Sequence, residues 1–283
     1  MNIFITGGSG FLGGHLTEAL LNGGHNCIIY DIKKPNYNIK NAKFCEGDLL
    51  DEKKIERLLK NIDIIYHFAG EADIDNSNKN PLAAVQNNIL ATTKLLNLSV
   101  KKKIKRFVFA SSVYVYSEQG GFYRTTKQAC ELLIENYHNI YKLNFTILRF
   151  GSLYGPRANN FNWLNKEITN IKKNKNIVRE TSGNELRSYI HVLDAAKLSL
   201  MALSSKYKNK YLMLTGSQSV TVKELLKLLK EISGSKSKIS YNNKKNTRDH
   251  YMITPFSFKP RMASKIKKEE EIDLGQGLYD LIF

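Results

Sequence analysis

Short apolar runs alternate with segments of helical periodicity along the first 150 residues. The runs typical of strands are Asn2–Thr6, Asn26–Tyr30, Ala42–Cys45, Ile62–His67, Ile104–Ala110 and Phe145–Arg149. Between them, the periodicity predicts helices at 11–22, 51–60, 81–100 and 123–142. Several strand runs are apolar at every position, as expected where both faces of a parallel sheet are covered. The alternation therefore predicts an α/β fold built on a doubly wound parallel sheet with right-handed crossovers.

The pattern changes after Gly151. Residues 156–183 are rich in Asn and Lys, and a strand-like run returns only at Tyr211–Leu214. Thr221 and Glu224 then have the spacing of a capping box at the start of a helix. We expect one domain made of residues 1–150 and 186–214, with the latter returning to the main sheet. A smaller, discontinuous C-terminal lobe would consist of 151–185 and 215–283.

From its composition we expect the chain to be a soluble cytoplasmic protein without a disulfide framework. It has three cysteines, no apolar run of membrane-spanning length and no basic, apolar leader before its first strand. The net charge of +17 raises the possibility of nucleic-acid binding. However, the lysines are spread along the chain beside asparagines, which is typical of solvated faces. We therefore expect no nucleic-acid partner, no membrane association and no bound metal, and we expect the charge to attract a phosphorylated small molecule.

The stretch ITGGSGFLGGH follows the first predicted strand and opens the first predicted helix. Gly7, Gly10 and Gly13 allow a tight turn, close approach of the backbone to a pyrophosphate, and packing of the helix on the strand. The phosphate would meet the free N–H groups at the helix N-terminus. A glycine cluster alone also fits a plain tight turn. Here Asp31 ends the next strand, where a carboxylate binds the adenosine ribose and repels a 2′-phosphate, so the pattern indicates a Rossmann-like domain that binds NAD rather than NADP.

Two further strand ends border the same predicted cleft. Asp48 and Leu49 follow the third strand and are expected beside the adenine, although a plain turn is the alternative. Ala69 and Gly70 follow the fourth strand and are small enough for a cofactor to pass, whereas we expect the neighbouring His67 to be packed rather than chemically active.

A serine, a tyrosine and a lysine follow the fifth strand. Ser112 lies at its carboxyl end, where open α/β sheets bind ligands. Tyr123 and Lys127 are four residues apart on the next helix and so share one face. A nearby ammonium group and a cationic nicotinamide ring would lower the pKa of the tyrosine and let it act as a base. A tyrosine and a lysine at this spacing are often only a helix face, but here they follow a glycine loop and a strand-end serine.

These motifs together resemble the extended short-chain dehydrogenases/reductases of the NAD-dependent nucleotide-sugar epimerase/dehydratase family. The matching segments are TGGSGFLG, Asp31, GDLLD, HFAG, Pro81 with Asn88, SSVYVY, Tyr123-x-x-x-Lys127, LRFGSLYGPR and RSYIHVLDAA.

The resemblance implies a catalytic set of Ser112, Tyr123 and Lys127, a bound NAD and a C-terminal lobe that holds a nucleoside diphosphate sugar. It also implies a homodimer formed through the helices at 81–100 and 123–142. The expected cofactor contacts are Gly7, Gly10, Phe11, Leu12, Gly13, Asp31, Asp48, Leu49, Phe68, Ala69, Gly70, Asn88, Tyr123 and Lys127. The expected substrate contacts are Ser152, Arg187 at the pyrophosphate and Arg261 at ribose or phosphate, with surface roles as the alternative for both arginines.

Three departures from the family pattern reduce the number of activities that the resemblance allows. The connection between the serine strand and the tyrosine helix is short, so a loop that normally walls the sugar pocket is missing. Val113 and Tyr114 stand where the family's 4,6-dehydratases carry an acidic pair, and Ser152 replaces an asparagine. Because elimination of water needs an additional acid and base, we expect no dehydratase.

The remaining chemistry is hydride transfer at C4 of a nucleotide sugar, by a 4-epimerase or a 4-dehydrogenase, in surface-polysaccharide sugar biosynthesis. A 4-keto-sugar reductase, a non-catalytic NAD-binding protein of the same fold and a nucleic-acid-associated protein stay open as alternatives.

Overall fold

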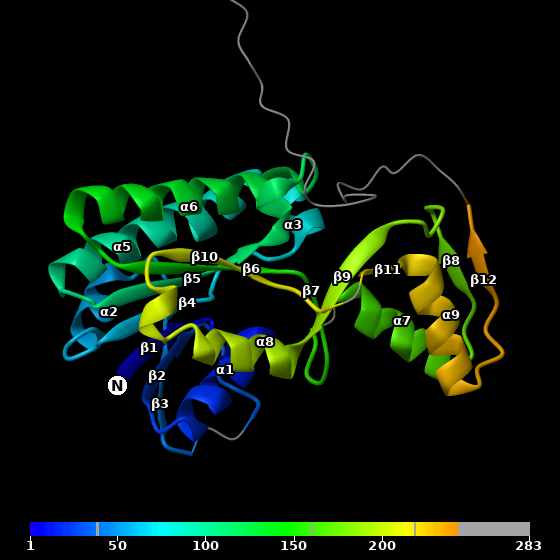
Figure 1. The fold of residues 1–283 in the computed structure, drawn as a ribbon, viewed down its shortest axis with the longest axis horizontal. Coiled ribbons are helices and arrows are strands. Elements are labelled where there is room, and N and C mark those ends of the chain that lie inside the picture. Colours follow the sequence, from blue (N-terminus) through cyan, green and yellow to red (C-terminus); the bar gives the residue numbers. More distant parts are fainter. Residues whose placement is uncertain (38–39, 160, 218, 243–283) are drawn as a thin grey trace, which may run out of the picture.

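The computed structural model describes residues 1–37, 40–159, 161–217 and 219–242. Its centre is a seven-stranded parallel sheet in the order β10-β6-β5-β4-β1-β2-β3 (Figure 1). The strands are β1 (Asn2–Thr6), β2 (Asn26–Asp31), β3 (Ala42–Glu46), β4 (Ile64–His67), β5 (Arg106–Ser112), β6 (Phe145–Phe150) and β10 (Lys210–Leu214). The predicted doubly wound parallel sheet is confirmed, with strand ends moved by at most two residues.

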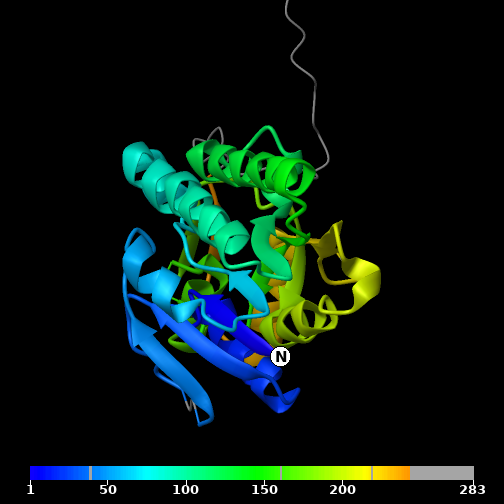
Figure 2. The same ribbon diagram turned by 90° about the vertical axis from the view of Figure 1, so that its left-hand side faces the viewer.

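Helices cover both faces of this sheet (Figures 1 and 2). On one face lie α1 (Phe11–Asn22) and α8 (Val192–Met201); on the other lie α2 (Glu52–Leu58), α5 (Ala91–Lys101) and α6 (Gly121–Tyr141). The side chains of β1 alternate between the two layers, since Phe4 packs with α2, α5 and α6, whereas Ile3 and Ile5 pack with α1 and α8. All three are fully buried, as are most positions of β4 and β5.

The helix expected at 81–100 is a continuous run of three pieces. It starts with α4 (Pro81–Ala84), passes through a π-helical segment η1 (Val85–Leu90) and continues as α5. A short helix, α3 (Ile74–Lys79), precedes it and was not predicted. Both α3 and η1 pack on α6. This packing places the loop after β4 beside the start of α6.

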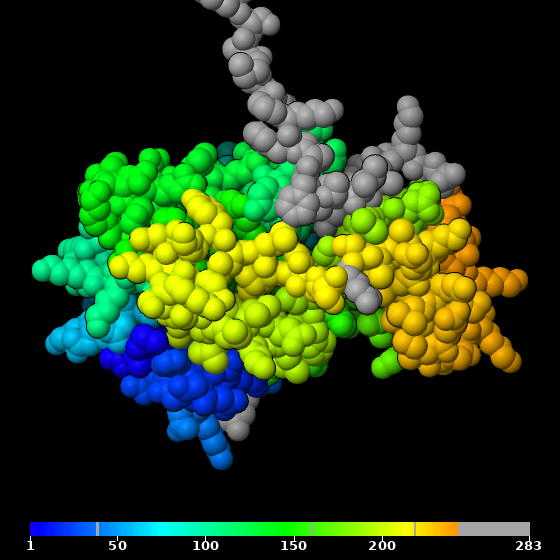
Figure 3. Space-filling model, viewed as in Figure 1, coloured from blue at the N-terminus to red at the C-terminus, as the bar shows by residue number. Residues whose placement is uncertain are grey.

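A second, smaller unit follows β6 and stands apart at one end of the molecule (Figures 1 and 3). It contains α7 (Trp163–Lys172) and α9 (Val222–Ser233), a two-stranded sheet of β8 (Ile177–Arg179) and β12 (Ile239–Tyr241), and a three-stranded sheet of β7 (Ser152–Tyr154), β9 (Leu186–His191) and β11 (Ser219–Thr221). Ile171, Ile177, Val222 and Leu226 form its core. The capping box at the start of α9 is present, with Thr221 and Glu224 bonding reciprocally.

Residues 186–214 contribute one strand to the seven-stranded sheet and one to the three-stranded sheet. We expected the whole segment to return to the main sheet; β10 does pair with β6, whereas β9 pairs with β7 and β11. The two short 3-10 turns, η2 (Val113–Tyr116) and η3 (Ser205–Tyr207), lie at strand and helix ends. The part of the expected C-terminal lobe beyond residue 242, with Arg261, lies outside the described residues. Within the described part, no helix is both long and apolar enough to cross a membrane.

Candidate active site

The glycine loop lies between β1 and α1 and is too crowded for side chains. A Cβ on Gly13 would lie 2.1 Å from the carbonyl oxygen of Gly7, and one on Gly7 would lie 2.5 Å from the backbone nitrogen of Ala69. Gly7 also has φ +72°, in the left-handed region that favours glycine. The loop therefore brings bare backbone to the end of the sheet, directly before the positive end of α1.

The ends of β2 and β3 close the same edge. Both carboxylate oxygens of Asp31 accept backbone N–H groups, from Ser9 at 3.0 Å and from Lys33 at 3.1 Å, so this side chain fixes the glycine loop. Asp48 accepts the Leu50 N–H at 2.8 Å, and its own carbonyl oxygen accepts the hydroxyl of Tyr30. Asp31 and Asp48 thus hold loops at neighbouring strand ends.

A dinucleotide fits this loop on two observations. The glycines leave a cradle that any Cβ would fill, and the buried hydroxyl oxygen of Ser9 in the same loop has no hydrogen-bond partner among the described residues. A buried polar atom without a partner is costly, and a phosphate oxygen would satisfy it. The first turn of α1, which starts at Phe11 and Leu12, would lie over the phosphates.

The end of β4 is held by a chain of hydrogen bonds. Thr6 Oγ1 and Thr92 Oγ1 bond the two ring nitrogens of His67 at 2.7 and 2.9 Å, and Thr6 Oγ1 also accepts the Ala69 N–H at 3.3 Å. Burial lowers the pKa of His67 to about 3, with Lys127 adding to the effect, so this histidine stays neutral. His67 is a packed residue that positions the loop.

The residues after His67 take different positions. The Phe68 ring packs edge-on against Tyr66 and Phe150, so only its backbone faces the glycine loop. Gly70 has φ +146°, and a Cβ there would lie 2.5 Å from Oδ1 of Asn88. Asn88 is buried and bonds the backbone of Glu71 and the hydroxyl of Thr126 on α6. Asn88 therefore connects the end of β4 to α6 within the protein.

Ser112, Tyr123 and Lys127 lie together at the end of β5. Ser112 Oγ accepts the backbone N–H of Tyr114 at 3.2 Å and is hydrogen bonded to the Tyr123 side chain. The hydrogen bond to Ser112 lowers the pKa of Tyr123, so it favours the phenolate, an oxygen to which only the serine proton can be donated. Lys127 Nζ donates to the carbonyl oxygen of Ala110 at 2.9 Å and lies 5.8 Å from the centre of the Tyr123 ring.

Burial acts against the charged forms of both α6 residues. It raises the pKa of Tyr123, and the hydrogen bond from Ser112 acts in the opposite direction. It lowers the pKa of Lys127, whereas Cys130 and Glu131 raise it. In the protein alone the tyrosine is therefore a weak acid, and an additional cation beside it would be needed to bring its pKa towards neutrality.

The short connection between β5 and α6 is tied to the helix by side chains. Arg124 donates to the carbonyl oxygen of Ser117 and Gln128 donates to that of Val115, both at 2.9 Å. Gly120, with φ +105°, lets the ring of Tyr114 pack closely; that ring lies edge-on to Tyr123 with centroids 6.3 Å apart. The connection is therefore ordered by its own contacts, although it is short.

A buried ion pair behind the site was not predicted. The carboxylate of Glu131, one turn after Lys127, accepts the Ser111 hydroxyl at 2.5 Å and the Arg149 guanidinium through both oxygens. Arg149 in turn bonds the hydroxyl of Tyr116. These contacts join α6, β5, β6 and η2. The only sequence signal would have been two opposite charges within otherwise apolar segments.

Two of the three expected substrate contacts, Ser152 and Arg187, lie at the border of the second unit. Ser152 begins β7 and pairs with Tyr189 in β9. Arg187 on β9 is buried, and its Nη1 donates to the carbonyl oxygen of Leu186 at 2.9 Å. Beside it Glu185 is also buried, and its Oε2 has no hydrogen-bond partner in the part of the chain that the structure describes. The Arg187 side chain is buried, so it does not have the surface position considered as the alternative; its contact with a pyrophosphate stays a prediction.

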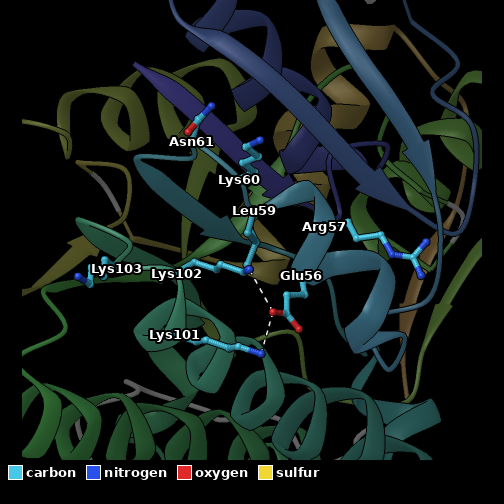
Figure 4. A pocket seen from close by; sticks show the side chains of 8 residues that line it. All are labelled: Glu56, Arg57, Leu59, Lys60, Asn61, Lys101, Lys102 and Lys103. Atoms are coloured by element: carbon cyan, nitrogen blue, oxygen red, sulfur yellow. Dashed lines mark ion pairs between the residues drawn. The ribbon is translucent and has the colours of Figure 1, made fainter.

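A hollow of about 560 Å³ lies away from these residues (Figure 4). It is lined by the ends of α2 and α5, where Lys101 and Lys102 both pair with Glu56. This is the edge of the sheet opposite the glycine loop, and the lysines there neutralise helix C-termini and one glutamate. The hollow therefore does not belong to the site.

A glycine loop on a doubly wound sheet, with a serine, a tyrosine and a lysine at the neighbouring strand end, defines a short-chain dehydrogenase/reductase. The NAD dependent epimerase/dehydratase family matches residues 3–212, so the chain belongs to that family and its cofactor is NAD. The predicted family and cofactor are thus confirmed.

Three relatives illustrate the similarity. A putative UDP-glucose 4-epimerase of Methanocaldococcus jannaschii is 28% identical over 298 residues, covering 98% of this chain and 95% of the relative. A dTDP-D-glucose 4,6-dehydratase of Dictyostelium discoideum is 29% identical over 229 residues, covering 68% of this chain and 53% of the relative. The structure of the UDP-glucose 4-epimerase of Thermotoga maritima with UDP-glucose superposes with a TM-score of 0.82 at 27% identity, covering 90% of this chain and 89% of that one.

Proposed function

We propose that this protein catalyses NAD-dependent oxidoreduction at C4 of a nucleoside diphosphate sugar, as a 4-epimerase or a 4-dehydrogenase. The observation that carries the proposal is the arrangement of Ser112, Tyr123 and Lys127. Ser112 is hydrogen bonded to the Tyr123 side chain in a way that lowers the tyrosine pKa, and the Lys127 ammonium lies 5.8 Å from the centre of the tyrosine ring. These groups bind and deprotonate a sugar hydroxyl.

NAD, when bound, accepts the hydride from the sugar carbon, and its oxidised ring adds the cation that the site lacks. The residues of this chain transfer the proton and hold the sugar and the cofactor. Tyr123 removes the hydroxyl proton and Ser112 bonds the same oxygen. Lys127 is held by the Ala110 carbonyl oxygen at a distance from which its charge favours the phenolate. The glycine loop and Asp31 hold the dinucleotide.

The second unit is the proposed site for the nucleoside diphosphate. Arg187 and Ser152 border it from β9 and β7. A guanidinium group suits a pyrophosphate because it offers several N–H donors in a fixed plane. The relatives named above act on UDP- and dTDP-sugars, which agrees with this class of substrate.

A 4-epimerase or 4-dehydrogenase is favoured over a 4,6-dehydratase even though dehydratases are among the relatives. Val113 is buried at the start of η2, and the Tyr114 ring lies against Tyr123, so neither position directly after Ser112 offers a carboxylate. Elimination of water across C5 and C6 requires such an acid and base. A 4-keto-sugar reductase uses the same groups in the reverse direction and remains the second candidate.

The test is incubation of the purified protein with UDP-, GDP- and dTDP-sugars, with NADH absorbance and sugar products followed together. A C4-inverted sugar without net NADH identifies an epimerase, and NADH with a keto sugar identifies a dehydrogenase. Formation of a 4-keto-6-deoxy sugar would contradict the proposal, as would an absence of any product from a protein that binds NAD.

We also propose that the active form is a homodimer. Leu82 on α4 is 85% exposed, and Leu132 and Ile140 on α6 are 59% and 66% exposed. Since α4 packs on α6, these apolar side chains lie on adjacent helices. Exposed apolar surface of this kind is typical of an interface, and a second copy presenting the same two helices would cover it.

A further inference from the structure

The segment after β7 crosses from the second unit to the first helix of the nucleotide-binding domain. Gly155 has φ +138° and Arg157 has φ +64°, so the chain turns sharply around Pro156. The carbonyl oxygen of Pro156 then lies 3.0 Å from Nε2 of His15 on α1. The segment Leu-Tyr-Gly-Pro-Arg thus ends against α1, immediately beside the glycine loop.

Arg157 makes the contact through three side chains of that domain. Its Nη1 donates to Oε1 of Glu18 at 2.9 Å and its Nη2 to Oε2 at 2.5 Å. The same Nη2 lies 2.7 Å from Nδ1 of His15. The guanidinium also lies over the Tyr37 ring, 4.8 Å from its centre. This geometry, two-pronged to a carboxylate and stacked on a ring, is one that arginine alone provides.

Tyr37 carries the contact to the glycine loop. Its hydroxyl donates to the carbonyl oxygen of Gly8 at 2.5 Å. Its ring covers α1 at Gly14, where a Cβ would lie 2.9 Å from Cε1 of the tyrosine. Arg157 therefore packs on a ring that also covers α1 at Gly14 and whose hydroxyl bonds the loop at Gly8.

His15 is held in one protonation state by its neighbours. Nε2 faces the Pro156 carbonyl oxygen at 3.0 Å and the Arg157 Nε at 3.3 Å, and we place the proton on Nε2 because the carbonyl can only accept and is closer; Nδ1 then accepts from Arg157 Nη2 at 2.7 Å. Burial lowers the pKa of His15, and the charges of Arg157 and His191 lower it further, whereas the hydrogen bond to Pro156 and the charge of Glu18 raise it. A second proton on His15 would place a donor and a positive charge against the guanidinium.

We propose that Arg157 is a positioning residue of the NAD site: through Tyr37 and neutral His15 it holds the glycine loop in its binding conformation. Arg157 bonds Glu18 and His15 and stacks on Tyr37, so it acts on the cofactor through the side chains that pack on the loop. The arrangement is complete while His15 is neutral. These contacts weaken as the pH falls through the lowered pKa of His15. Because the pKa of His15 is lowered only while the contacts are formed, protonation of His15 favours their loss.

The test is the affinity for NAD, measured on the full-length chain after removal of bound nucleotide, and it does not depend on any sugar substrate. We expect Arg157→Gln to weaken NAD binding about tenfold at about pH 8, a pH well above the ordinary histidine pKa. Arg157→Lys should restore only part of the loss, because an ammonium group cannot bond Glu18 in two-pronged fashion. The control is Arg57→Gln on α2, an exposed arginine outside this contact.

A second pair of variants separates positioning from general destabilisation. In His15→Gln the amide can donate to Pro156 and accept from Arg157 but cannot take up a proton. This variant should bind NAD like the wild type at about pH 8 and lose less affinity than the wild type as the pH falls below the ordinary histidine pKa of about 6.5 and through the lowered pKa of His15. Tyr37→Phe removes the hydroxyl from Gly8 without a cavity and should weaken binding even if Arg157→Gln does not fold.

Unchanged NAD affinity in Tyr37→Phe or in a folded Arg157→Gln would overturn the proposal. If His15→Gln loses as much NAD affinity at low pH as the wild type does, the proposed role of His15 is wrong. Failure of the proposed sugar chemistry would leave these affinities untouched, so the two proposals fail separately.

Discussion

At the scale of single residues, the surroundings of Tyr123 disfavour the phenolate form that the proposed base requires. Burial raises the pKa of Tyr123, and within the protein the Ser112 hydrogen bond counteracts this rise. The proposed base therefore depends on three additions to a buried phenol: the serine proton, the Lys127 charge and the cation of oxidised NAD.

Ser112→Ala should shift the pH dependence of sugar oxidation. The Ser112 hydrogen bond stabilises the phenolate, so its loss raises the pKa of Tyr123 and moves the rising limb of the rate profile to higher pH. A hydrogen bond to a charged group contributes about 1.5–3 kcal/mol, which corresponds to a shift of about one to two pH units. Rates measured across pH at saturating NAD check this. A lower rate with an unmoved limb would mean that Ser112 only binds the sugar.

The sequence predicted the proposed catalytic residues but not the residues that hold the site in place. Ser112, Tyr123 and Lys127 stand out because a strand end and a four-residue helical spacing bring them together. Glu131 and Arg149 are on different elements, and no spacing rule connects them, so their pairing became visible only when β6 lay beside β5. The same holds for Arg157 and His15, which are 142 residues apart.

At the scale of elements, the large features were predictable and the small ones were not. The seven strands of the main sheet were visible as apolar runs, and α1, α2, α6 and α9 as periodic or capped segments. The strands β7, β8, β11 and β12 have three residues each, which is too short for any periodicity to show. Their placement depends on contacts between distant segments, such as β8 with β12.

Gly13→Ala should abolish NAD binding with little effect on the rest of α1. The new Cβ would lie 2.1 Å from the Gly7 carbonyl oxygen, so the loop would have to open. Gly23→Ala, at the other end of the same helix, is the matched control, because its Cβ would meet no atom closer than 3.4 Å and its φ is −77°. Titration with NAD compares the two. Wild-type affinity in Gly13→Ala would show that the nucleotide does not depend on this loop.

At the scale of the whole molecule, the site lies where the two units meet. The main sheet ends at the glycine loop and at Ser112, and the second unit approaches the same edge through β7 and β9 (Figure 1). The exposed apolar residues of α4 and α6 lie on the outer side of the large unit, on the far side of α6 from the sheet.

Leu132→Asp should convert the proposed dimer into monomers. A charge buried at an apolar interface without a partner is strongly unfavourable. Light scattering after size-exclusion chromatography gives the mass directly. Ile232→Asp on α9 is the control, since Ile232 is 75% exposed but belongs to the second unit. A monomeric wild type, or a dimer that survives Leu132→Asp, would contradict the interface.

The proposed role of Tyr123 as the base of a C4 oxidoreduction can be tested with the variant Tyr123→Phe. The rate of C4 chemistry on the sugar found to react, in wild type, Tyr123→Phe and Tyr137→Phe, is the decisive measurement. Tyr137 is on the same helix, and its hydroxyl bonds only the exposed side chain of Asn97. We expect a loss of about 10²–10⁴-fold in Tyr123→Phe, with NAD binding retained, and no loss in Tyr137→Phe. Turnover at the wild-type rate in Tyr123→Phe would contradict the proposed role.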